Sequence, residues 1–563
     1  MKNKKDIAPI DVAYFSMEFA LSSDIPNYAG GLGVLAADMM YSATDLGLQA
    51  VGVSLIYHQN DDPKLAFPLA KYLQRCPETI EVKIESRVVK VAIWKKEIKS
   101  GRHRLPIYFL STYLPENERW DRDLTKNLYS DNAYTRLCQE TLLGVGGVRA
   151  LEALGYTDIR RYHMNEGHCS LLTLELLKKN NYDENKVRSL CSFTTHTPIA
   201  SGHDYFDYDL AYRTIGDVLT WDIRQLAGND RLGMTQLGLA LSAKANAVSR
   251  RHTQVCREMF PDHKFESITN GVYHPHWAGR HMRNLLDENF PDWRERPEVL
   301  ADAPSRLADK ELLRARRREK EDLVEWINSN PEFFPFRDVT DEDYFSEDVL
   351  TIGFARRFVP YKRPELIFRQ AEALRNIGNK KLQLVFAGHC GPTDNFCNNI
   401  MHTIEDYTQK FRGEIKVALV PDYKLDIAFR LVSGCDVWLN TPIPPREASG
   451  TSGMKAALNG CLNLSIPDGW WVEGIKKYPA SGWAFGSRTA SLDEVCRDDE
   501  DAKDLIAKLQ NVIYCYYEKK EEWTERMKYS IALLSYFNTH RVVREYCEKM
   551  WNVENASITD EVD

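Results

Sequence analysis

The sequence predicts an α/β protein with two doubly wound, mostly parallel sheets, and three observations support this class. First, short apolar stretches typical of buried strands alternate with amphipathic stretches typical of helices. Second, stretches rich in glycine and polar residues follow the apolar ones, as expected where loops at the carboxyl ends of parallel strands bind ligands. Third, a chain of 563 residues is too long for one hydrophobic core, so two or three domains are expected.

The predicted elements follow from these two kinds of stretch, apolar for strands and amphipathic for helices. Short apolar runs predict strands at 48–58, 87–94, 189–197, 349–356, 382–389, 414–421, 436–442 and 462–468. Amphipathic runs predict helices at 134–154, 167–179, 239–260, 305–328, 363–376 and 423–433. The order of strands and helices is therefore the repeating one of βαβ units.

A domain boundary is predicted near 329–347, where the chain is acidic, contains proline and loses its periodicity. A highly charged helix precedes this segment, and a fresh series of strands and helices follows it. We therefore expect an N-terminal α/β domain at 1–335 and a C-terminal α/β domain at 346–510. The last helices, at 511–563, are expected to cross back onto the N-terminal domain.

The composition is that of an ordinary globular protein, with 43% hydrophobic and 27% charged residues. A formal net charge of −8 without a basic stripe argues against nucleic-acid binding. No run of 18 apolar residues and no apolar segment after the N-terminal lysines is present, so neither a membrane span nor a signal peptide is expected. The 12 cysteines are scattered singly, which is typical of reduced thiols. We therefore expect a cytoplasmic protein without membrane partners.

The stretch NYAGGLGVLAAD (27–38) places three glycines, Gly30, Gly31 and Gly33, where a loop opens into a helix. Backbone NH groups at such a helix start can hold an anion. A tight turn before a helix explains the same pattern equally well.

The stretch GFARRFVPYKRPEL (353–366) brings four cations after an apolar strand: Arg356, Arg357, Lys362 and Arg363. A run of charges is usually a solvated face. Here the cations follow a strand rather than lying along a helix, which favours an anion site, since arginine and lysine both suit phosphate oxygens.

The stretch EASGTSGMKAALNG (447–460) is a loop of small residues beside one lysine, with a helix after it. It does not match the nucleotide-binding pattern G-x-x-x-x-G-K-[ST], because Met454 separates Gly453 from Lys455. A lysine next to a phosphate-holding loop can instead form a Schiff base with pyridoxal phosphate, whose phosphate would rest on the NH groups of Thr451, Ser452 and Gly453. A surface lysine at a helix start is the alternative.

Histidines and a carboxylate follow two further apolar strands, in YHMNEGHCSLL (162–172) and SFTTHTPIASGHDYF (192–206). His163 and His168 are five residues apart, which fits a helical zinc site poorly. Structural histidines or polar groups lining a sugar cleft are favoured, and no metal is expected.

Together these stretches resemble the α-glucan phosphorylase family, of the glycogen and maltodextrin phosphorylase type. The shared motifs YFSMEFALSSDIPNYAGGLGVLAAD, HMNEGH, TTHTP, ITNGV, FARRFVPYKR and EASGTSGMKAALNG occur in the order typical of that family. The resemblance covers residues 12–552. TSGMK followed by DGWWVEG is similar to the compact prokaryotic members.

The resemblance implies a GT-B fold, in which two Rossmann-like domains face a deep cleft, with the N-terminal domain binding glucan. It implies pyridoxal 5′-phosphate on Lys455 of the C-terminal domain. The reaction implied is retaining phosphorolysis of α-1,4-glucans (glycogen, starch or maltodextrin) to α-D-glucose 1-phosphate, with the cofactor phosphate as proton relay. Glucan and inorganic phosphate are the implied partners, and a homodimer is one option for the assembly.

Motif positions carry the roles of family residues onto this chain. Arg356 is expected to contact the cofactor phosphate, and Arg357 and Lys362 to clamp the substrate phosphate. Backbone NH groups of Gly30 and Gly31 are expected between the two phosphates. Gly31 thus joins Lys455, Arg357 and Lys362 as catalytic positions. The other cofactor residues implied are Thr451, Ser452, Gly453, Tyr361, Tyr423 and Trp277, and those implied for the glucosyl ring are Glu447, Ser449, Gly450, Asn270 and the backbone of His196. Glu166 lies where the family usually has an acid, and no acid or base role is expected of it.

Two other functions remain as alternatives at this point. A GT-B glycosyltransferase using a nucleotide sugar, similar to glycogen synthase, shares a Gly-Gly-Leu-Gly loop and paired cations, but lacks the lysine of SGMK. A catalytically silent glucan-binding protein would be expected to have lost Arg357, Lys362 or Lys455, and all three are present.

Overall fold

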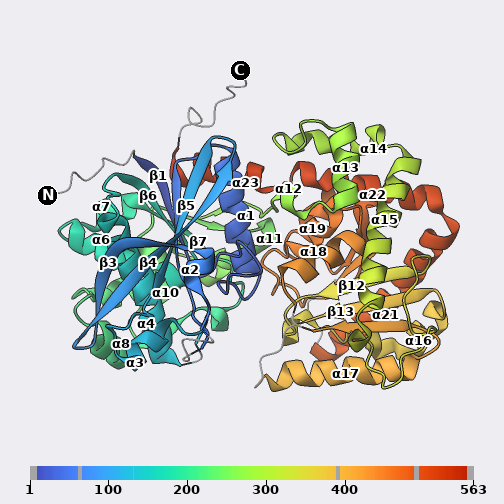
Figure 1. The fold of residues 1–563 in the computed structure, drawn as a ribbon, viewed down its shortest axis with the longest axis horizontal. Coiled ribbons are helices and arrows are strands. Elements are labelled where there is room, and N and C mark those ends of the chain that lie inside the picture. Colours follow the sequence, from blue (N-terminus) through green and yellow to red (C-terminus); the bar gives the residue numbers. More distant parts are fainter. Residues whose placement is uncertain are drawn as a thin grey trace. The chain divides into compact units, whose positions relative to one another are not determined.

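The computed structural model describes residues 9–60, 66–130, 132–388, 394–421, 423–486 and 494–553. The chain divides into two compact units. Unit 1 comprises Met1–Thr269 and Thr539–Asp563, and unit 2 comprises Asn270–Asn538. Each unit contains its own α/β sheet (Figure 1).

Unit 1 is built on a nine-stranded sheet of order β11-β10-β7-β6-β1-β2-β5-β4-β3. The strands from β11 to β5 pair in parallel, whereas β4 and β3 add an antiparallel extension. The bounds are β1 (Ile10–Ser16), β2 (Ala50–Leu55), β3 (Gln74–Ile84), β4 (Arg87–Ser100), β5 (His103–Ser111), β6 (Ile159–Asn165), β7 (Cys191–Thr194), β10 (Lys244–Ala247) and β11 (Phe265–Ser267). A separate antiparallel pair is formed by β8 (Tyr205–Asp207) and β9 (Arg231–Gly233).

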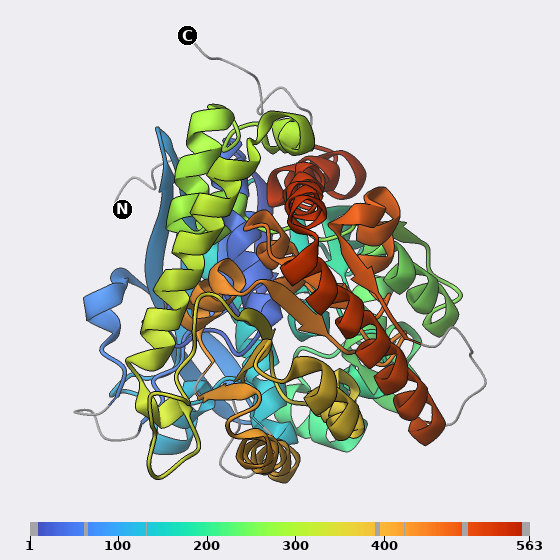
Figure 2. The ribbon, with the colours of Figure 1, turned by 90° about the vertical axis from the view of Figure 1, so that its right-hand side faces the viewer.

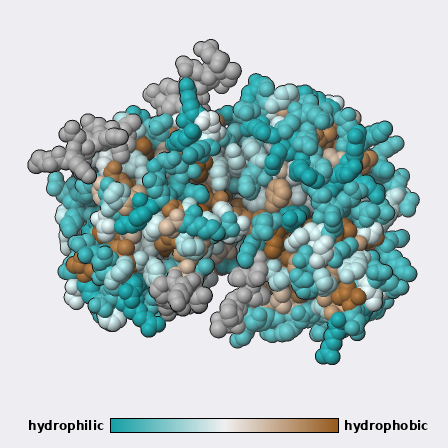
Figure 3. All heavy atoms as spheres, viewed as in Figure 1, coloured by the Kyte–Doolittle hydropathy of each residue, from teal (hydrophilic) through white to brown (hydrophobic). Residues whose placement is uncertain are grey.

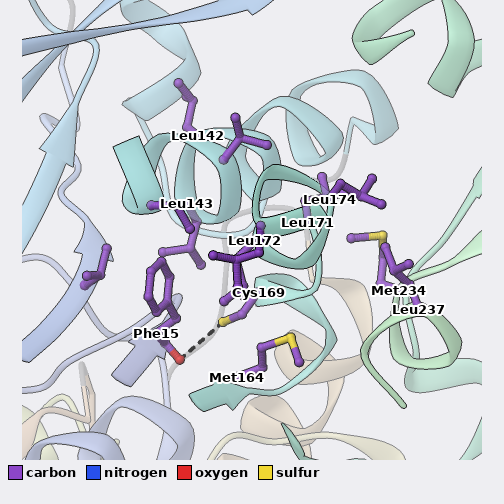
Figure 4. Close-up of a cluster of buried hydrophobic side chains, with 14 of the residues drawn as sticks. Phe15, Leu142, Leu143, Met164, Cys169, Leu171, Leu172, Leu174, Met234 and Leu237 are labelled. Carbon is purple, nitrogen blue, oxygen red and sulfur yellow. Dashed lines mark hydrogen bonds between the residues drawn. The ribbon is translucent and has the colours of Figure 1, made fainter. Parts of the chain in front are cut away.

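Helices cover this sheet and bury its apolar residues. They are α1 (Gly31–Asp45), α2 (Leu69–Tyr72), α3 (Arg119–Arg122), α4 (Ala133–Thr141), α5 (Gly147–Ala153), α6 (Leu172–Lys179), α7 (Glu184–Leu190), α8 (Tyr208–Ile215), α9 (Ile223–Ala227), α10 (Met234–Ala240), α11 (Arg250–Met259) and α23 (Thr539–Tyr546). Figure 4 shows part of this core, in which Phe15 of β1 faces leucines of the neighbouring helical segments. The Cys169 thiol donates a hydrogen bond to the Phe15 carbonyl at 3.3 Å, so this cysteine is a core residue.

The chain returns to unit 1 through α23, which packs on α1 (Figure 1). The hydroxyls of Ser42 and Thr539 lie 2.6 Å apart, and His540 lies 3.1 Å from the Asp45 carboxylate. Val542, Val543 and Tyr546 of the same helix are buried in the unit 1 core. These contacts hold the C-terminal helix on unit 1.

Unit 2 is built on a six-stranded, fully parallel sheet of order β14-β13-β12-β15-β16-β17. Its order reverses at β12, which is the topology of a doubly wound fold. The bounds are β12 (Leu350–Ala355), β13 (Leu382–Ala387), β14 (Lys416–Val420), β15 (Val437–Asn440), β16 (Leu462–Ser465) and β17 (Gly482–Ala484). Every described residue of β12, β13, β15 and β16 is buried, as expected of parallel strands covered on both faces.

Two long helices of unit 2, α15 (Asp309–Asn328) and α21 (Glu494–Glu518), flank its strands in Figure 2. The remaining helices are α12 (His274–Trp277), α13 (Arg280–Asn289), α14 (Ala303–Arg306), α16 (Ala371–Gly378), α17 (Asn395–Phe411), α18 (Leu425–Gly434), α19 (Ser452–Leu458), α20 (Trp471–Lys477) and α22 (Lys520–Ala532). Helix α15 is anchored by Lys320, whose Nζ lies 2.5 Å from the Asp436 carboxylate and 2.7 Å from the Val349 carbonyl. This buried ion pair fixes α15 to the start of the unit 2 strands.

The division into units differs from the domain boundaries that the sequence predicts. The chain leaves unit 1 at Thr269 rather than at 335, and it returns at Thr539 rather than at 511. The reason is that the charged helix α15 packs on α18 and α22, and its buried Arg316 donates to the Cys435 carbonyl at 2.7 Å. The irregular segment at 329–347 therefore lies inside unit 2 and connects two of its own elements.

Each predicted strand overlaps a strand of the structure, and the alternation of strands and helices around parallel sheets is confirmed. The predicted strand 87–94 is the first part of β4, which is longer and pairs antiparallel with its neighbours. The prediction of one helix over 239–260 is wrong, because β10 lies inside that range between α10 and α11. Four small or polar residues, KANA, form this strand, and its burial between β7 and β11 overrides their weak strand propensity. Strands β1, β3, β5, β6, β8, β9, β11 and β17 lie outside the ranges that the sequence predicts as strands.

On the face drawn in Figure 3, the coloured residues of both units are mostly hydrophilic, with scattered hydrophobic ones. None of the helices in the described ranges has the length and hydrophobicity needed to span a bilayer. Ten described cysteines are free thiols, most of them buried. Cys397 differs from the sequence expectation of reduced thiols, because it is disulfide-bonded.

Candidate active site

Lys455 lies in helix α19 of unit 2, one turn after the small-residue loop. Its side chain is only 7% exposed, and Nζ lies 3.9 Å from the ring centroid of Trp277. Trp277 is 1% exposed at the end of α12. The sequence alternative of a surface lysine is therefore wrong: Lys455 is held on the face of a buried indole, where cation–π attraction orients it.

The loop before Lys455 is fixed by contacts from neighbouring strands. The Ser452 hydroxyl accepts a hydrogen bond from Trp438 Nε1 at 3.1 Å, and the Gly453 carbonyl accepts one from the Asn463 amide at 3.0 Å. The Thr451 carbonyl accepts from the backbone NH of Lys455 at 3.2 Å. These contacts hold the start of α19 rigidly over β15 and β16.

Replacing Gly453 with alanine is expected to disturb this loop. An added Cβ would lie 2.4 Å from Asn463 Oδ1 and 3.0 Å from the Trp470 ring, so α19 must shift. We expect a loss of stability of about 1–3 kcal/mol, typical of overpacking. Thermal unfolding of Gly453→Ala measures it, and an unchanged midpoint would show that α19 has more room than the structure gives it.

A buried ion-pair cluster lies next to this loop, around Glu447. Glu447 Oε2 accepts hydrogen bonds from Lys362 Nζ at 2.6 Å and from Arg356 Nη2 at 2.8 Å. Arg356 also donates to Asn440 at the end of β15, and the Glu447 backbone NH donates to Asp468 at 2.8 Å. The structure thus brings together two cations and one carboxylate that lie about 90 residues apart in the chain.

The protonation state of Glu447 follows from this cluster. Burial alone would raise the pKa of the carboxyl, but the positive charges of Arg356 and Lys362 outweigh burial and lower it to about 2. Glu447 is therefore ionised at neutral pH. Two cations thus lie on one carboxylate oxygen, a local concentration of positive charge that suits an anionic ligand.

The four cations predicted near β12 divide into different environments. Arg357 is exposed and makes no hydrogen bond or ion pair with the described part of the chain. Arg363, by contrast, is 2% exposed and has φ +45°. It pairs with Asp498 at 2.6 Å and Asp501 at 2.8 Å. Its predicted membership of an anion site is wrong, because these carboxylates of α21 already neutralise it.

Two buried polar atoms of this region lack partners. Arg356 Nε and the Ser449 hydroxyl make no hydrogen bond within the described ranges. Unpaired buried polar atoms are rare, so each is a candidate contact for a ligand. Next to Ser449, Gly450 has φ +85°, a backbone conformation that glycine adopts readily.

The two tyrosines expected beside the cofactor are also placed in unit 2. Tyr361 has its ring 4.5 Å from Lys362 Nζ, and its carbonyl accepts from the Ile443 backbone at 2.8 Å. Tyr423 is partly buried and bonds through its backbone NH to the Gly388 carbonyl at 3.4 Å. Asn270, at the first position of unit 2, is 3% exposed.

The glycine loop of unit 1 is organised by Glu18. One oxygen of this buried carboxylate accepts the backbone NH groups of Ala29 at 2.7 Å and Gly30 at 3.2 Å, and the other accepts the Tyr129 hydroxyl. Gly31 is the first residue of α1, and a Cβ added at Gly30 or Gly31 would meet no atom within 4 Å. The space beside the Cα atoms of both glycines is therefore open, although the Gly30 NH itself is taken by Glu18.

His196 is held by a second buried carboxylate, Glu166. The His196 backbone NH donates to Glu166 at 2.6 Å, and its ring Nε2 lies 2.7 Å from Asn165 Oδ1. Burial lowers the pKa of the His196 ring to about 4 although Glu166 favours its charged form, so the ring is neutral at pH 7. Glu166 accepts four hydrogen bonds and thereby fixes the conformation of this loop.

Sequence reasoning missed Glu18, Asp468 and Asn459, which hold the glycine loop, the Glu447 backbone and the Trp277 segment. Glu18 belongs to the quoted motif YFSMEF, but nothing in its spacing indicates that it bonds to Gly30. Each of these residues acts on backbone groups distant in sequence, and a single sequence carries no signal for such contacts.

Comparison with known proteins gives a consistent result. The family model described as carbohydrate phosphorylase matches residues 209–514. Maltodextrin phosphorylase from Thermococcus litoralis is 34% identical, with 96% of this chain and 70% of the relative aligned. Glycogen phosphorylase from Aquifex aeolicus is 32% identical, with 96% of this chain and 86% of the relative aligned. An uncharacterised protein from Methanocaldococcus jannaschii is 29% identical over 96% of this chain and 99% of its own length.

Proposed function

Because the chain belongs to the carbohydrate phosphorylase family, we propose that it transfers glucosyl residues from an α-1,4-glucan to inorganic phosphate. The products are the shortened glucan and α-D-glucose 1-phosphate, with retained configuration. Relatives named as maltodextrin and glycogen phosphorylases support this reaction. The structural observation that supports it best is Lys455, a buried lysine on Trp277, inside a loop of small residues.

The chemistry of the Lys455 pocket fits pyridoxal 5′-phosphate. Lys455 would hold the cofactor covalently, and Thr451, Ser452 and Gly453 would hold its phosphate. The unpaired Nε of Arg356 is a donor suited to a phosphate oxygen, and Trp277, Tyr361 and Tyr423 would line the pocket. When bound, the cofactor supplies a phosphate group with a pKa of about 6, which can hold and release a proton near neutral pH.

The substrate phosphate needs cations, because two phosphates close together repel. Two unit charges ~4 Å apart repel by about 4 kcal/mol at an effective dielectric of ~20. Arg357 is exposed and free to bind an anion, and Lys362 already lies beside Arg356 across the Glu447 carboxylate. We assign both side chains to the substrate phosphate.

The glucosyl ring is assigned to the loop that contains Glu447, Ser449 and Gly450. The ionised Glu447 carboxylate can accept hydrogen bonds from sugar hydroxyls, and the unpaired Ser449 hydroxyl can donate or accept one. Asn270 and the His196 backbone complete the proposed set. The proposal further takes the two units as the two Rossmann-like domains of a GT-B fold, with NH groups of Gly30 and Gly31 between the two phosphates. For this role the Gly30 NH would have to exchange its hydrogen bond to Glu18 for one to a phosphate. The parallel α/β sheet in each unit supports this assignment.

Two measurements on the purified protein test the proposal. The first is the near-UV absorbance of bound pyridoxal phosphate and its fixation to Lys455 by borohydride. The second is phosphate release from glucose 1-phosphate with maltoheptaose as primer. We expect both signals. A protein with neither would be a nucleotide-sugar glycosyltransferase or a silent glucan binder instead.

Replacing Arg357 with alanine is expected to weaken the use of phosphate. The change removes an exposed guanidinium without opening the core, so we expect normal folding and cofactor content. The apparent KM for phosphate should rise about tenfold or more, because a charge-assisted hydrogen bond contributes roughly 1.5–3 kcal/mol. Initial rates at varied phosphate concentration measure this, with Arg369→Ala, which removes a surface arginine of unit 2 paired with Asp499, as the control. An unchanged KM would remove Arg357 from the phosphate site.

A further inference from the structure

Asn459, the residue that follows α19, joins the lysine-bearing helix to the segment that carries Trp277. Its side chain is fully buried and uses both ends of its amide. Oδ1 accepts the backbone NH of Gly279 at 2.7 Å, and Nδ2 donates to the Trp277 carbonyl at 2.9 Å. Nδ2 also donates to the Lys455 carbonyl at 2.9 Å. One amide therefore holds the backbones of Trp277 and Lys455 at a fixed separation.

The segment that follows Trp277 is also held by Glu319 of α15. Glu319 Oε1 accepts the backbone NH groups of His281 at 2.6 Å and Met282 at 3.1 Å. A Cβ at Gly279 would lie 2.4 Å from the same carboxylate, so the chain passes Glu319 closely. Glu319 fixes the start of α13, whereas Asn459 fixes the two residues on either side of Ala278. Asn459 is thus a direct contact between α19 and the backbone on which the indole is carried.

The indole in turn determines where the Lys455 amine can lie. Nζ is 3.9 Å from the Trp277 centroid, and the side chain is almost entirely buried, so its rotamers are restricted by the ring. His276 precedes Trp277, and burial together with the charge of Lys455 lowers the pKa of its ring to about 4. His276 therefore adds no second positive charge next to the amine at neutral pH.

We propose that Asn459 is a positioning residue, which fixes the Trp277 ring against Lys455 and thereby directs the amine toward the aldehyde of the cofactor. The proposal rests on the proposed function, because it assumes that Lys455 carries pyridoxal phosphate. Attachment joins the lysine nitrogen to the aldehyde carbon with loss of one water. Asn459 touches neither group and acts only through the backbones of Trp277, Gly279 and Lys455.

The test is the rate at which pyridoxal phosphate attaches to the apoenzyme, followed by near-UV absorbance and by borohydride fixation. Asn459→Ala is expected to slow attachment by roughly tenfold or more, because three buried hydrogen bonds are lost. The absorbance of the attached cofactor is expected to titrate at a shifted pH. Attachment at the wild-type rate with a wild-type titration would overturn the proposal.

Asn117 of unit 1 offers a matched control. It is 6% exposed, its Oδ1 accepts the Lys90 backbone NH at 2.9 Å, and its Nδ2 donates to the carbonyls of Lys90 at 2.7 Å and Thr112 at 2.8 Å. Like Asn459→Ala, Asn117→Ala therefore removes one accepted and two donated hydrogen bonds to the backbone, but in unit 1 rather than beside Lys455. We expect it to lower the thermal midpoint and leave cofactor attachment unchanged. If both variants slow attachment equally, the Asn459 effect is one of general stability and the proposal fails.

A double variant separates action through Trp277 from a direct effect. In a Trp277→Ala background, Asn459→Ala is expected to add little further slowing, since the ring it positions is gone. Independent, multiplying effects would contradict the proposal.

If Asn459→Ala does not fold, Asn459→Asp keeps the acceptor for Gly279 and loses the donors. The attachment rate of this variant should approach that of wild type at low pH, where the protonated carboxyl can donate a hydrogen bond again. A ratio of the two attachment rates that does not change with pH would contradict the proposal.

The same experiment distinguishes a failure of the proposed function. A wild-type protein that never acquires the near-UV absorbance would overturn the assignment of Lys455, and the Asn459 proposal with it. A wild-type protein that does acquire it, beside an Asn459→Ala variant that behaves identically, would overturn only the role of Asn459.

Discussion

Lys455→Ala is expected to abolish covalent cofactor attachment and to reduce phosphorolysis below detection. The amine is the only atom of the side chain that can join the cofactor aldehyde, and no other lysine lies against Trp277 within the described residues. The change should not unfold the protein, because alanine suits a helix interior and Lys455 lies within α19. Absorbance, borohydride labelling and the rate of phosphate release measure the effect.

The control for this variant is Lys476→Ala, which removes an exposed lysine from α20 of the same unit. It should retain full absorbance and activity. Circular dichroism and thermal unfolding should show that both variants are folded. Near-UV absorbance and normal turnover in Lys455→Ala would show that the cofactor site lies elsewhere, and the proposed function would lose its main structural support.

Glu447→Gln is expected to cause the second large effect, a loss of glucosyl binding with retained cofactor. The carboxylate that we assign to sugar hydroxyls becomes a neutral amide, and turnover should fall by about 100-fold, the factor for roughly 3 kcal/mol. Cofactor content should stay intact because Lys455 does not depend on this side chain. Loss of cofactor and turnover together would instead make Glu447 a scaffold residue for Arg356 and Lys362.

The same variant should also be less stable, by an amount that depends on pH. The neutral amide leaves Arg356 and Lys362 largely buried without a carboxylate, a change that costs about 3–5 kcal/mol in comparable buried pairs. The pKa of Glu447 is about 2 in the folded protein and about 4.3 in an unfolded chain. Its stabilisation is therefore complete above pH ~4.3 and is lost as the pH falls towards 2.

Urea unfolding of wild type and variant between pH 7 and pH 3 measures this difference. The gap in free energy of unfolding should be constant near neutral pH and should narrow below pH ~4.3. Glu405→Gln is the control, since it breaks a solvent-exposed contact with His402 and should change stability little. If the difference in free energy of unfolding between wild type and variant did not change with pH, Arg356 and Lys362 would not lower the pKa of Glu447.

The sequence alone determined the fold class and the main elements of the candidate site. Alternating apolar and amphipathic runs indicated the parallel α/β sheets, because burial on both faces demands continuous apolar strands. The loop 447–460 predicted a lysine beside a turn of small residues, because these residues and Lys455 are adjacent in the chain, and the structure places that lysine in a buried position. Local periodicity and short motifs carry this kind of information directly.

Only the tertiary structure decided which charges meet and where the compact units divide. Arg363 and Lys362 are neighbours in sequence, yet one pairs with carboxylates of α21 and the other with Glu447. Helix α15 has no mark in its sequence that assigns it to unit 2; the buried pair of Lys320 and Asp436 does so. The bonds of Asn459 to Trp277 and Gly279 span about 180 residues. Such partners depend on long-range packing, in which desolvation makes each buried polar group find a partner, and a local sequence pattern cannot specify which one.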